Sequence, residues 1–244
     1  MEEQLWKACA NGKVEEVIKL LQNAQINTNW QGSEYSYLTS LYIVNYSDYL
    51  STPFYIACEK GHIEIVKLLL NDRRVDINQA NQNNATSFYI VCEKGHIEIV
   101  KLLLNDKRVD INKAKWKGET PFYIACEKGH IEIVKLLLND QRVDIDQANK
   151  NLRTPFYVAC QQGHIEIVKY LLAGRRKIDI NKRDKDGKTA IDIARERGKT
   201  NLVEFIELSQ KNQSETRSKL RKELDLPGFF FFFFFFFFFF FFFF

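Results

Sequence analysis

Proline, methionine and histidine are scarce in this sequence, whose 244 residues include four prolines, one methionine and four histidines. Cysteine occurs five times, an odd number, and no pair of cysteines has the CxxC spacing. The first twelve residues, MEEQLWKACANG, lack the basic segment and apolar stretch of a secretory signal. These features argue against a disulfide-stapled secreted protein, so we expect a cytoplasmic, or at least intracellular, location.

The chain also lacks a large excess of charge of either sign. The chain has 35 basic and 31 acidic residues, a net charge of +4 at pH 7. That excess is too small to imply a polyanionic partner. Nucleic-acid binding would require a clear basic face with stacking aromatic residues, and acidic residues lie among the basic doublets of this chain. The charge pattern therefore does not favour a nucleic-acid-binding protein.

A long apolar run occurs only at the C-terminus, where Phe229–Phe244 accounts for 16 of the 21 phenylalanines. As a helix this run would span about 24 Å, short of the hydrocarbon core of roughly 30 Å. An uncharged run of phenylalanine is also a strong aggregation segment in water. Three interpretations stay open: a strained membrane anchor, a dispensable tail, or a product of an uninterrupted T tract.

An internal repeat explains most of the remaining sequence. The string CEKGHIEIVKLLLND occurs unchanged at Cys58–Asp72, Cys92–Asp106 and Cys126–Asp140, and a drifted copy begins at Cys160. The glycine of this string recurs every 34 residues. A fixed period of this length predicts a solenoid, in which each unit buries its apolar face against its neighbours.

Each repeat is expected to form two short helices and a loop, here called the finger. Thr52 precedes a proline, which is typical of a helix N-cap followed by proline at the first helical position. The first helix should end at Gly61, a residue suited to the left-handed conformation. The second helix then begins and places Ile65, Val66, Leu69 and Leu70 on one apolar face.

The string TPFYIACEKGHIEIVKLLL, followed by VDIN, resembles the ankyrin repeat, whose first helix usually begins TPLHxA. The resemblance extends from Glu2 to about Leu208 and implies an all-α-dominated repeat solenoid of stacked helix pairs. Three departures stand out. Tyrosine replaces the histidine of that motif, the finger lacks the usual glycine after the second helix, and Ser87 replaces proline in one repeat.

The resemblance divides residues 1–210 into about six units. These are a first cap (2–21), four full units (51–84, 85–118, 119–152 and 153–187) and a last cap (188–208). A tyrosine-rich insertion (22–50) separates the first cap from the full units. A polar basic segment (211–228) and the phenylalanine run (229–244) follow. We expect the last unit to be closed by apolar residues beneath a polar outer face: Leu202, Val203, Phe205 and Ile206.

The reactive residue types each occupy one repeat position. All four histidines begin a second helix, and all five cysteines lie in a first helix beside a small residue, as buried structural cysteines do. A Cys58–His62 pair has the spacing of one helical turn, but Gly61 between them ends the helix. There is no P-loop, no GxGxxG after a strand, no GxSxG and no HExxH. We therefore expect no enzyme, no metal site and no cofactor.

Candidate partner-binding residues lie where the repeats differ and where aromatic residues gather. Trp116 stands among lysines in the finger KAKWKG, either as an exposed anchor or packed on a neighbouring finger. The insertion contains five of the ten tyrosines, which fit an interface or a segment folded over the first units. The candidates are Tyr35, Tyr37, Tyr46, Arg74, Arg108, Trp116 and Arg142.

The sequence thus predicts a non-catalytic scaffold that binds another protein through its fingers and first helices. The alternative is a membrane-tethered adaptor held by Phe229–Phe244. The identity of the partner is not encoded in the repeat pattern, because a repeat fold presents surfaces and not a chemistry of its own.

Overall fold

The structure is a computed structural model that describes residues 1–32, 50–174 and 176–226. These residues form 13 helices, and the single β-bridge among them joins Gly32 to Ser51. They belong to two compact units, of which the first is Met1–Pro155 and the second begins at Phe156. The helical repeat architecture predicted from the sequence is confirmed.

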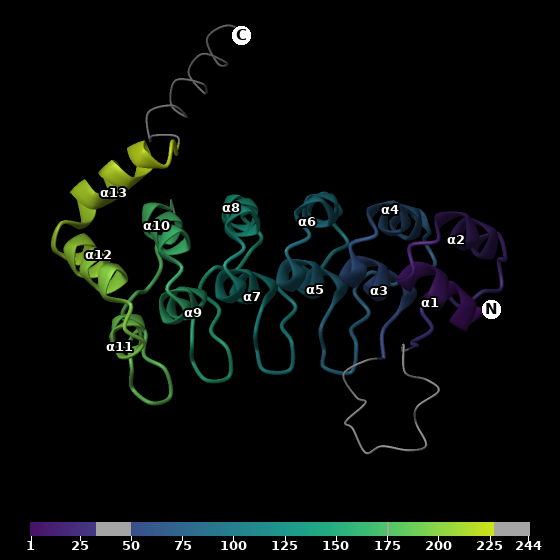
Figure 1. Cartoon of the computed structure of the whole chain (residues 1–244), viewed down its shortest axis with the longest axis horizontal. Coiled ribbons are helices and arrows are strands. Elements are labelled where there is room, and N and C mark those ends of the chain that lie inside the picture. Colours follow the sequence, from purple (N-terminus) through teal and green to yellow (C-terminus); the bar gives the residue numbers. More distant parts are fainter. Residues whose placement is uncertain (33–49, 175, 227–244) are drawn as a thin grey trace, which may run out of the picture. The chain divides into compact units, whose positions relative to one another are not determined.

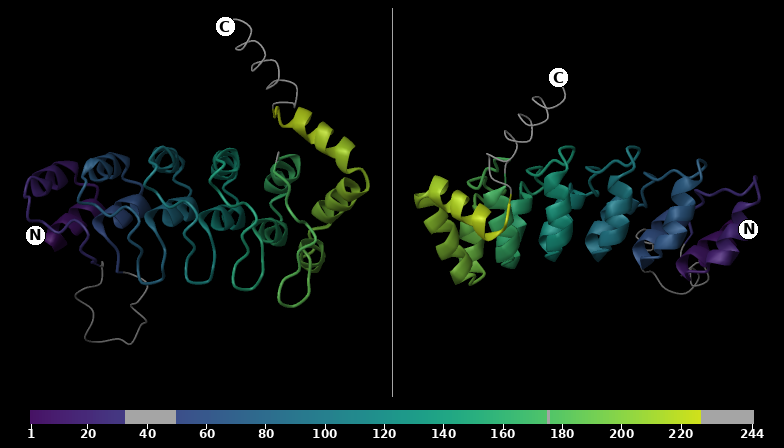
Figure 2. Two further views of the ribbon diagram at one scale, coloured as in Figure 1. Left: turned by 180° about the vertical axis from the view of Figure 1, so that it is seen from behind. Right: turned by 90° about the horizontal axis from the view of Figure 1, so that it is seen from above.

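The first unit is a stack of four helix pairs. Its helices are α1 (Glu2–Ala10), α2 (Val14–Leu21), α3 (Pro53–Lys60), α4 (Ile63–Asn71), α5 (Ser87–Lys94), α6 (Ile97–Leu104), α7 (Pro121–Lys128) and α8 (Ile131–Asn139). Figure 1 shows the first helices of the pairs in one row, the second helices in another, and the fingers projecting on the far side of the first row. Neighbouring helices within each row are in contact, and they lie side by side in the second view of Figure 2.

Local chemistry sets the ends of the first helices as the sequence predicts. The hydroxyl oxygens of Thr52, Thr86 and Thr120 accept hydrogen bonds from the backbone N–H three residues later, at 3.1, 3.2 and 3.1 Å. The first helices α3, α5 and α7 then end at a glycine in the left-handed conformation, such as Gly61 with φ +78°. These caps satisfy backbone groups that such short helices would otherwise leave without partners.

The core of the first unit lies between the two rows of helices. In the second helix α4, Ile65, Val66, Leu69 and Leu70 are all buried, as the helical spacing predicts. First helices are buried over most of their length, and their phenylalanines are about 1% exposed. Each helix has eight or nine residues and would be unstable alone, so burial between neighbouring repeats supplies the stability.

The second unit contains α9 (Pro155–Gln162), α10 (Ile165–Ala173), α11 (Ala190–Glu196), α12 (Thr200–Lys211) and α13 (Gln213–Glu223). In α12, Leu202, Val203 and Ile206 are buried, and Phe205 is half-buried. The segment described from its composition as polar and basic contains α13, which packs on α10 and α12. Arg217 and Arg221 of α13 donate hydrogen bonds to the carbonyls of Gly174 and Ala173, at the end of α10.

Within residues 1–32, 50–174 and 176–226, no helix has the length and apolar character needed to cross a membrane. The Phe229–Phe244 run lies outside the described residues.

Candidate functional site

The five cysteines are all buried, as predicted. Their side chains are essentially inaccessible, and none of them forms a disulfide: Cys9, Cys58, Cys92, Cys126 and Cys160. Burial raises the pKa of the Cys9 thiol from 9.0 to about 12 and raises the pKa of Cys58, Cys92 and Cys160 as well. A nucleophilic cysteine needs a stabilised thiolate and access to a substrate, and these thiols have neither.

The histidines of the first unit connect neighbouring repeats. The Nε2–H of His96 donates to the backbone carbonyl of Glu59 at 2.9 Å, and His130 does the same to Glu93 at 2.9 Å. A Cβ atom on Gly61 would lie 2.9 Å from Cε1 of His96, so the ring packs directly on the glycine that ends the preceding first helix. Among the described residues, no group of three His, Cys, Asp or Glu side chains could hold a metal ion.

The three arginine candidates also connect repeats. Arg108 forms a two-oxygen ion pair with Asp106 and donates to the carbonyl of Leu70, in α4 of the preceding repeat, at 2.8 Å. Arg142 repeats this arrangement with Asp140 and Leu104. Arg74 pairs with Asp72 and donates to the carbonyls of Leu21 and Asn23. The arginines thus stabilise helix C-termini, and their contact with a partner stays a prediction.

A row of asparagines fixes the base of each finger. The Asn78 side chain donates to the carbonyl of Arg108 at 2.7 Å and accepts from the backbone N–H of Asp110 at 2.9 Å. Asn112 makes the same pair of bonds to Arg142 and Asp144, at 2.7 and 2.9 Å. Each finger is therefore held to the next at its base, so the tips project from a defined position.

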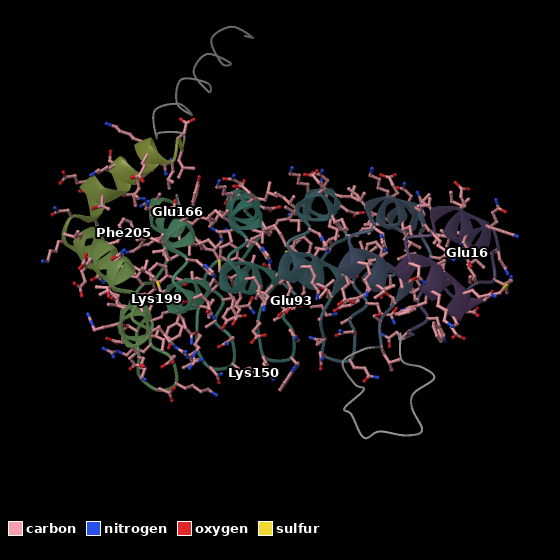
Figure 3. The ribbon with its side chains drawn as sticks, viewed as in Figure 1. Glu16, Glu93, Lys150, Glu166, Lys199 and Phe205 are labelled. Carbon is pink, nitrogen blue, oxygen red and sulfur yellow. The ribbon has the colours of Figure 1, made fainter. Side chains whose placement is uncertain are left out.

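The finger tip that carries Trp116 is joined to the tips of both neighbouring fingers. The backbone N–H of Trp116 donates to the carbonyl of Asn83 in one neighbouring finger, and Lys117 accepts from the backbone N–H of Lys150 in the other, at 3.0 and 2.9 Å. The indole itself is 51% exposed, and the ammonium groups of Lys117 and Lys150 lie 5.5 and 5.8 Å from its ring centroid. Figure 3 shows Lys150 at the fingers, far from Glu16 in the row of second helices.

A tyrosine from each first helix faces the finger of its own repeat, where the sequence pattern has tyrosine instead of histidine. The hydroxyl of Tyr55 accepts a hydrogen bond from Asn81 at 3.3 Å, and that of Tyr123 accepts one from Asn149 at 3.0 Å. In the second unit, the Tyr157 hydroxyl donates to Asp184 at 2.8 Å. These bonds connect the start of a first helix to the tip of its finger.

The repeat of residues 85–118 breaks this pattern. Its finger carries Lys115 at the asparagine position, and the Tyr89 hydroxyl is buried without a hydrogen-bond partner among the described residues. The Lys115 ammonium group lies instead 5.6 Å from the centroid of the Tyr89 ring. Burial and the negative charge of Glu93 raise the pKa of Tyr89, so its hydroxyl stays protonated at neutral pH.

The last turns of the first helices carry a row of half-buried carboxylates, Glu59, Glu93 and Glu127. Figure 3 places Glu93 beside the first-helix row, on the side from which the fingers project. Burial, and next the charge of Glu119, raise the pKa of Glu127. The surface between helices and finger tips is therefore acidic at its base and basic at its tips.

The tyrosine candidates Tyr35, Tyr37 and Tyr46 lie outside the described residues. Gly32, within the described part of the insertion, and Ser51, just after the insertion, are joined by reciprocal backbone hydrogen bonds, both 3.0 Å long. The indole of Trp6 in α1 donates to the carbonyl of Ser51 at 2.9 Å, which fixes this point to the first repeat.

Two residues near Trp116, the exposed Leu152 and the half-buried Lys115, were not among the candidates from the sequence. Leu152, at the tip of the next finger, is 52% exposed and has a left-handed backbone with φ +62°. The importance of Lys115 depends on Tyr89, whose ring its ammonium group faces. Aligning the finger residues by repeat position, instead of seeking aromatic residues alone, would have singled out both.

Comparison with known proteins agrees with this architecture. The family model described as ankyrin repeats (three copies) matches residues 2–81, 54–149 and 141–215. Among solved structures, the crystal structure of EF0377, an ankyrin repeat protein, superposes with a TM-score of 0.69 and is 29% identical in sequence. The match covers 84% of this chain and 96% of that one. No curated protein matches the sequence. The helix pairs, the finger loops and the matched residues together show that this chain belongs to the ankyrin repeat family.

Proposed function

We propose that this chain is a non-catalytic scaffold that binds another protein through its fingers and first helices. Ankyrin repeats are generally protein–protein interaction modules. The cysteine side chains are buried in the stack, and the side chains of His96 and His130 are hydrogen-bonded to backbone carbonyls within it. The surface on which the repeats differ, and on which a partner could be distinguished, is that of the finger tips.

The exposure of Trp116 is the observation that carries this proposal. Its backbone N–H is held by a hydrogen bond to the carbonyl of Asn83 in a neighbouring finger, while the residue is 51% exposed. A large aromatic side chain on a held backbone loses little conformational entropy when a partner covers it, and tryptophan is enriched among residues that dominate binding energy. Trp116 is therefore the proposed anchor of the interface.

The other candidates stay within the proposal at different places. Arg74, Arg108 and Arg142 follow the second helices, where their exposed edges could add polar contacts to a partner. Tyr35, Tyr37 and Tyr46 would extend an interface beyond the first repeat. We further propose an intracellular location, because five buried cysteines without a disulfide suit a reducing compartment.

A capture experiment with the full chain tests the proposal. Proteins retained by the wild type should be lost with Trp116→Ala and kept with Ile18→Ala. Ile18 is a matched control, since it is an exposed apolar residue, 37% accessible, on the second helix α2. If Trp116→Ala retains the same proteins at the same level as wild type, Trp116 does not anchor a partner and the proposal fails.

A further inference from the structure

The finger tips of the first unit share an unusual charge composition. Residues 79–84, 113–118 and 147–152 contain four lysines and no acidic residue. The lysines are Lys113, Lys115, Lys117 and Lys150. Three of the four belong to the single finger 113–118, whereas the corresponding tip 79–84 is uncharged. Positive charge is therefore concentrated around Trp116.

These ammonium groups differ from the lysines of the second helices. Lys67, Lys101 and Lys135 each pair with a glutamate one turn earlier, at 2.8, 2.7 and 2.6 Å. Within the part of the chain that the structure describes, none of the four finger lysines forms an ion pair with a carboxylate. Instead, Lys117 and Lys150 flank the exposed indole, and Lys115 lies over the Tyr89 ring. A carboxylate from outside the chain would meet lysines that no internal ion pair occupies.

Lys115 has a structural cost that its position in the stack does not offset. Its presence leaves the hydroxyl of Tyr89 buried without a hydrogen bond, where the asparagines of the repeats on either side satisfy the corresponding tyrosines. A buried polar group without a partner lowers the stability of the fold. A function for Lys115 outside the stack would account for a lysine at this position.

An apolar element accompanies the charge. Leu152 is 52% exposed with a left-handed backbone that leucine adopts at an energetic cost, at the position where the two preceding fingers have Asn84 and Gly118. Its finger is joined to that of Trp116 by the bond from Lys150 to Lys117. Two exposed apolar side chains thus lie on adjacent, connected finger tips amid unpaired lysines.

We infer that Lys113, Lys115, Trp116, Lys117, Lys150 and Leu152, here called the finger patch, bind an acidic peptide segment of the partner. The segment would carry carboxylates for the lysines and an apolar side chain for Trp116 and Leu152. This inference rests on the proposed function and names its partner class. The half-buried glutamates Glu93 and Glu127 repel an acidic chain at the base of the fingers, so the segment lies across the tips.

A nucleic acid fits the finger patch less well than an acidic peptide. Single-stranded nucleic acids use several aromatic side chains, on which successive bases stack. The finger patch offers one exposed aromatic ring. A short acidic segment with an apolar residue needs only a local basic surface with an apolar centre.

The test uses the full chain and a fluorescein-labelled peptide of twelve residues, ten glutamates and two central leucines. Its comparison probes are the same peptide with glutamine for glutamate and a labelled single-stranded RNA of twelve nucleotides. Fluorescence anisotropy should show the acidic peptide bound at least tenfold more tightly than either comparison probe. The affinity for the acidic peptide should fall steeply as the salt concentration rises, because salt screens the attraction between the lysines and the carboxylates.

Two matched variants assign the binding to the finger patch. The first is a triple variant of the finger lysines, Lys115→Gln, Lys117→Gln and Lys150→Gln, and it should lower the affinity for the acidic peptide at least tenfold. The second is a triple variant of second-helix lysines, Lys67→Gln, Lys101→Gln and Lys135→Gln, and it should change that affinity less than twofold. Both remove three positive charges, and thermal unfolding verifies that both fold. The inference is overturned if the chain binds the acidic peptide no more tightly than the glutamine peptide, or if RNA binds more tightly than the acidic peptide. It is also overturned if both triple variants lower the affinity for the acidic peptide equally. If the capture experiment still shows that a partner is lost with Trp116→Ala, the proposed scaffold function holds and only the acidic partner class is rejected.

Discussion

The ammonium group of Lys115 lies 5.6 Å from the ring centroid of Tyr89, at the repeat position where Asn81 and Asn149 bond the tyrosine hydroxyls of the repeats on either side. One substitution in an otherwise regular array thus removes an internal hydrogen bond and adds a charge to the finger. Stability and binding have different demands at this position, and separate measurements can resolve them.

The first prediction compares two equivalent tyrosines. Tyr123→Phe removes the hydrogen bond from Asn149 and should lower the free energy of unfolding by about 1 kcal/mol. Tyr89→Phe removes a hydroxyl without a partner and should be neutral or slightly stabilising. Lys115→Asn should restore the bond and raise the free energy of unfolding by about 1 kcal/mol. Urea denaturation of the three variants measures these differences, and equal losses for both Phe variants would contradict the assignment.

The second prediction concerns the arginine of the repeat 85–118. Arg108→Gln loses the ion pair with Asp106 and the bond to Leu70, and should cost about 1 kcal/mol at pH 7. The side-chain bonds from Arg108 lower the pKa of Asp106 below its ordinary value of 3.8. The pair therefore contributes full stability above pH 3.8 and loses it as the pH falls through the lower folded-state pKa.

The difference between Arg108→Gln and wild type should accordingly shrink in acid. Denaturation at pH 7, 5, 4 and 3 measures this difference, and Arg73→Gln is the control, since Arg73 is an exposed arginine next to Arg74 in the preceding repeat. A difference that stays constant across this range would show that the ion pair does not carry the effect.

The third prediction concerns the thiols. Burial raises the pKa of Cys9 from 9.0 to about 12, and raises that of the other core cysteines Cys58, Cys92 and Cys160. The folded state therefore favours protonated thiols. The contribution of these thiols to stability should be constant below pH 9 and fall as the pH rises toward 12, because the unfolded chain releases these protons first. Urea melts between pH 7 and 11 measure the decline.

Thiol labelling gives an independent measurement on the same residues. At pH 8 all five cysteines should react slowly in the native protein and completely after unfolding in urea. Rapid native labelling of Cys92 or Cys126 would contradict their burial in the middle of the stack.

The fourth prediction separates α13 from the phenylalanine run. A chain ending after Asn212 loses Arg217, Arg221 and the buried Leu220, and its α10 should exchange amide hydrogens faster than in the full chain. The loss of these contacts should cost roughly 2–4 kcal/mol. A chain ending after Gly228 keeps α13 and should match the full chain in α10 exchange, with a higher soluble yield. Equal exchange of α10 in all three chains would contradict a stabilising role for α13.

Features set within one repeat could be predicted from the sequence. The threonine caps, the left-handed Gly61 and the buried Leu69 depend on neighbours a few residues away, so the repeated string is sufficient to locate them. The position of α13 was not predicted, because its composition is polar and its attachment depends on two arginines that reach α10 from more than forty residues away.

The candidate site was predicted in part for the same reason. Trp116 stands out in a polar finger by its residue type alone, and its exposure favours the anchor interpretation over packing between fingers. Arg108 was proposed from its charge. The carbonyl that it contacts belongs to a residue 38 positions earlier, so the local sequence pattern does not predict this contact. The consequence of Lys115 required knowing that Tyr89 faces it across the finger.

Site-specific photocrosslinking tests the central claim, that a partner binds at the finger tips, most directly. Benzoylphenylalanine replaces Trp116 in one full chain and Ile18 on α2 in another, and the adducts formed in cells are compared by mass spectrometry. The structure predicts a discrete adduct with one partner protein from position 116 and none from position 18. Adducts from position 18 with none from position 116 would contradict binding through the fingers.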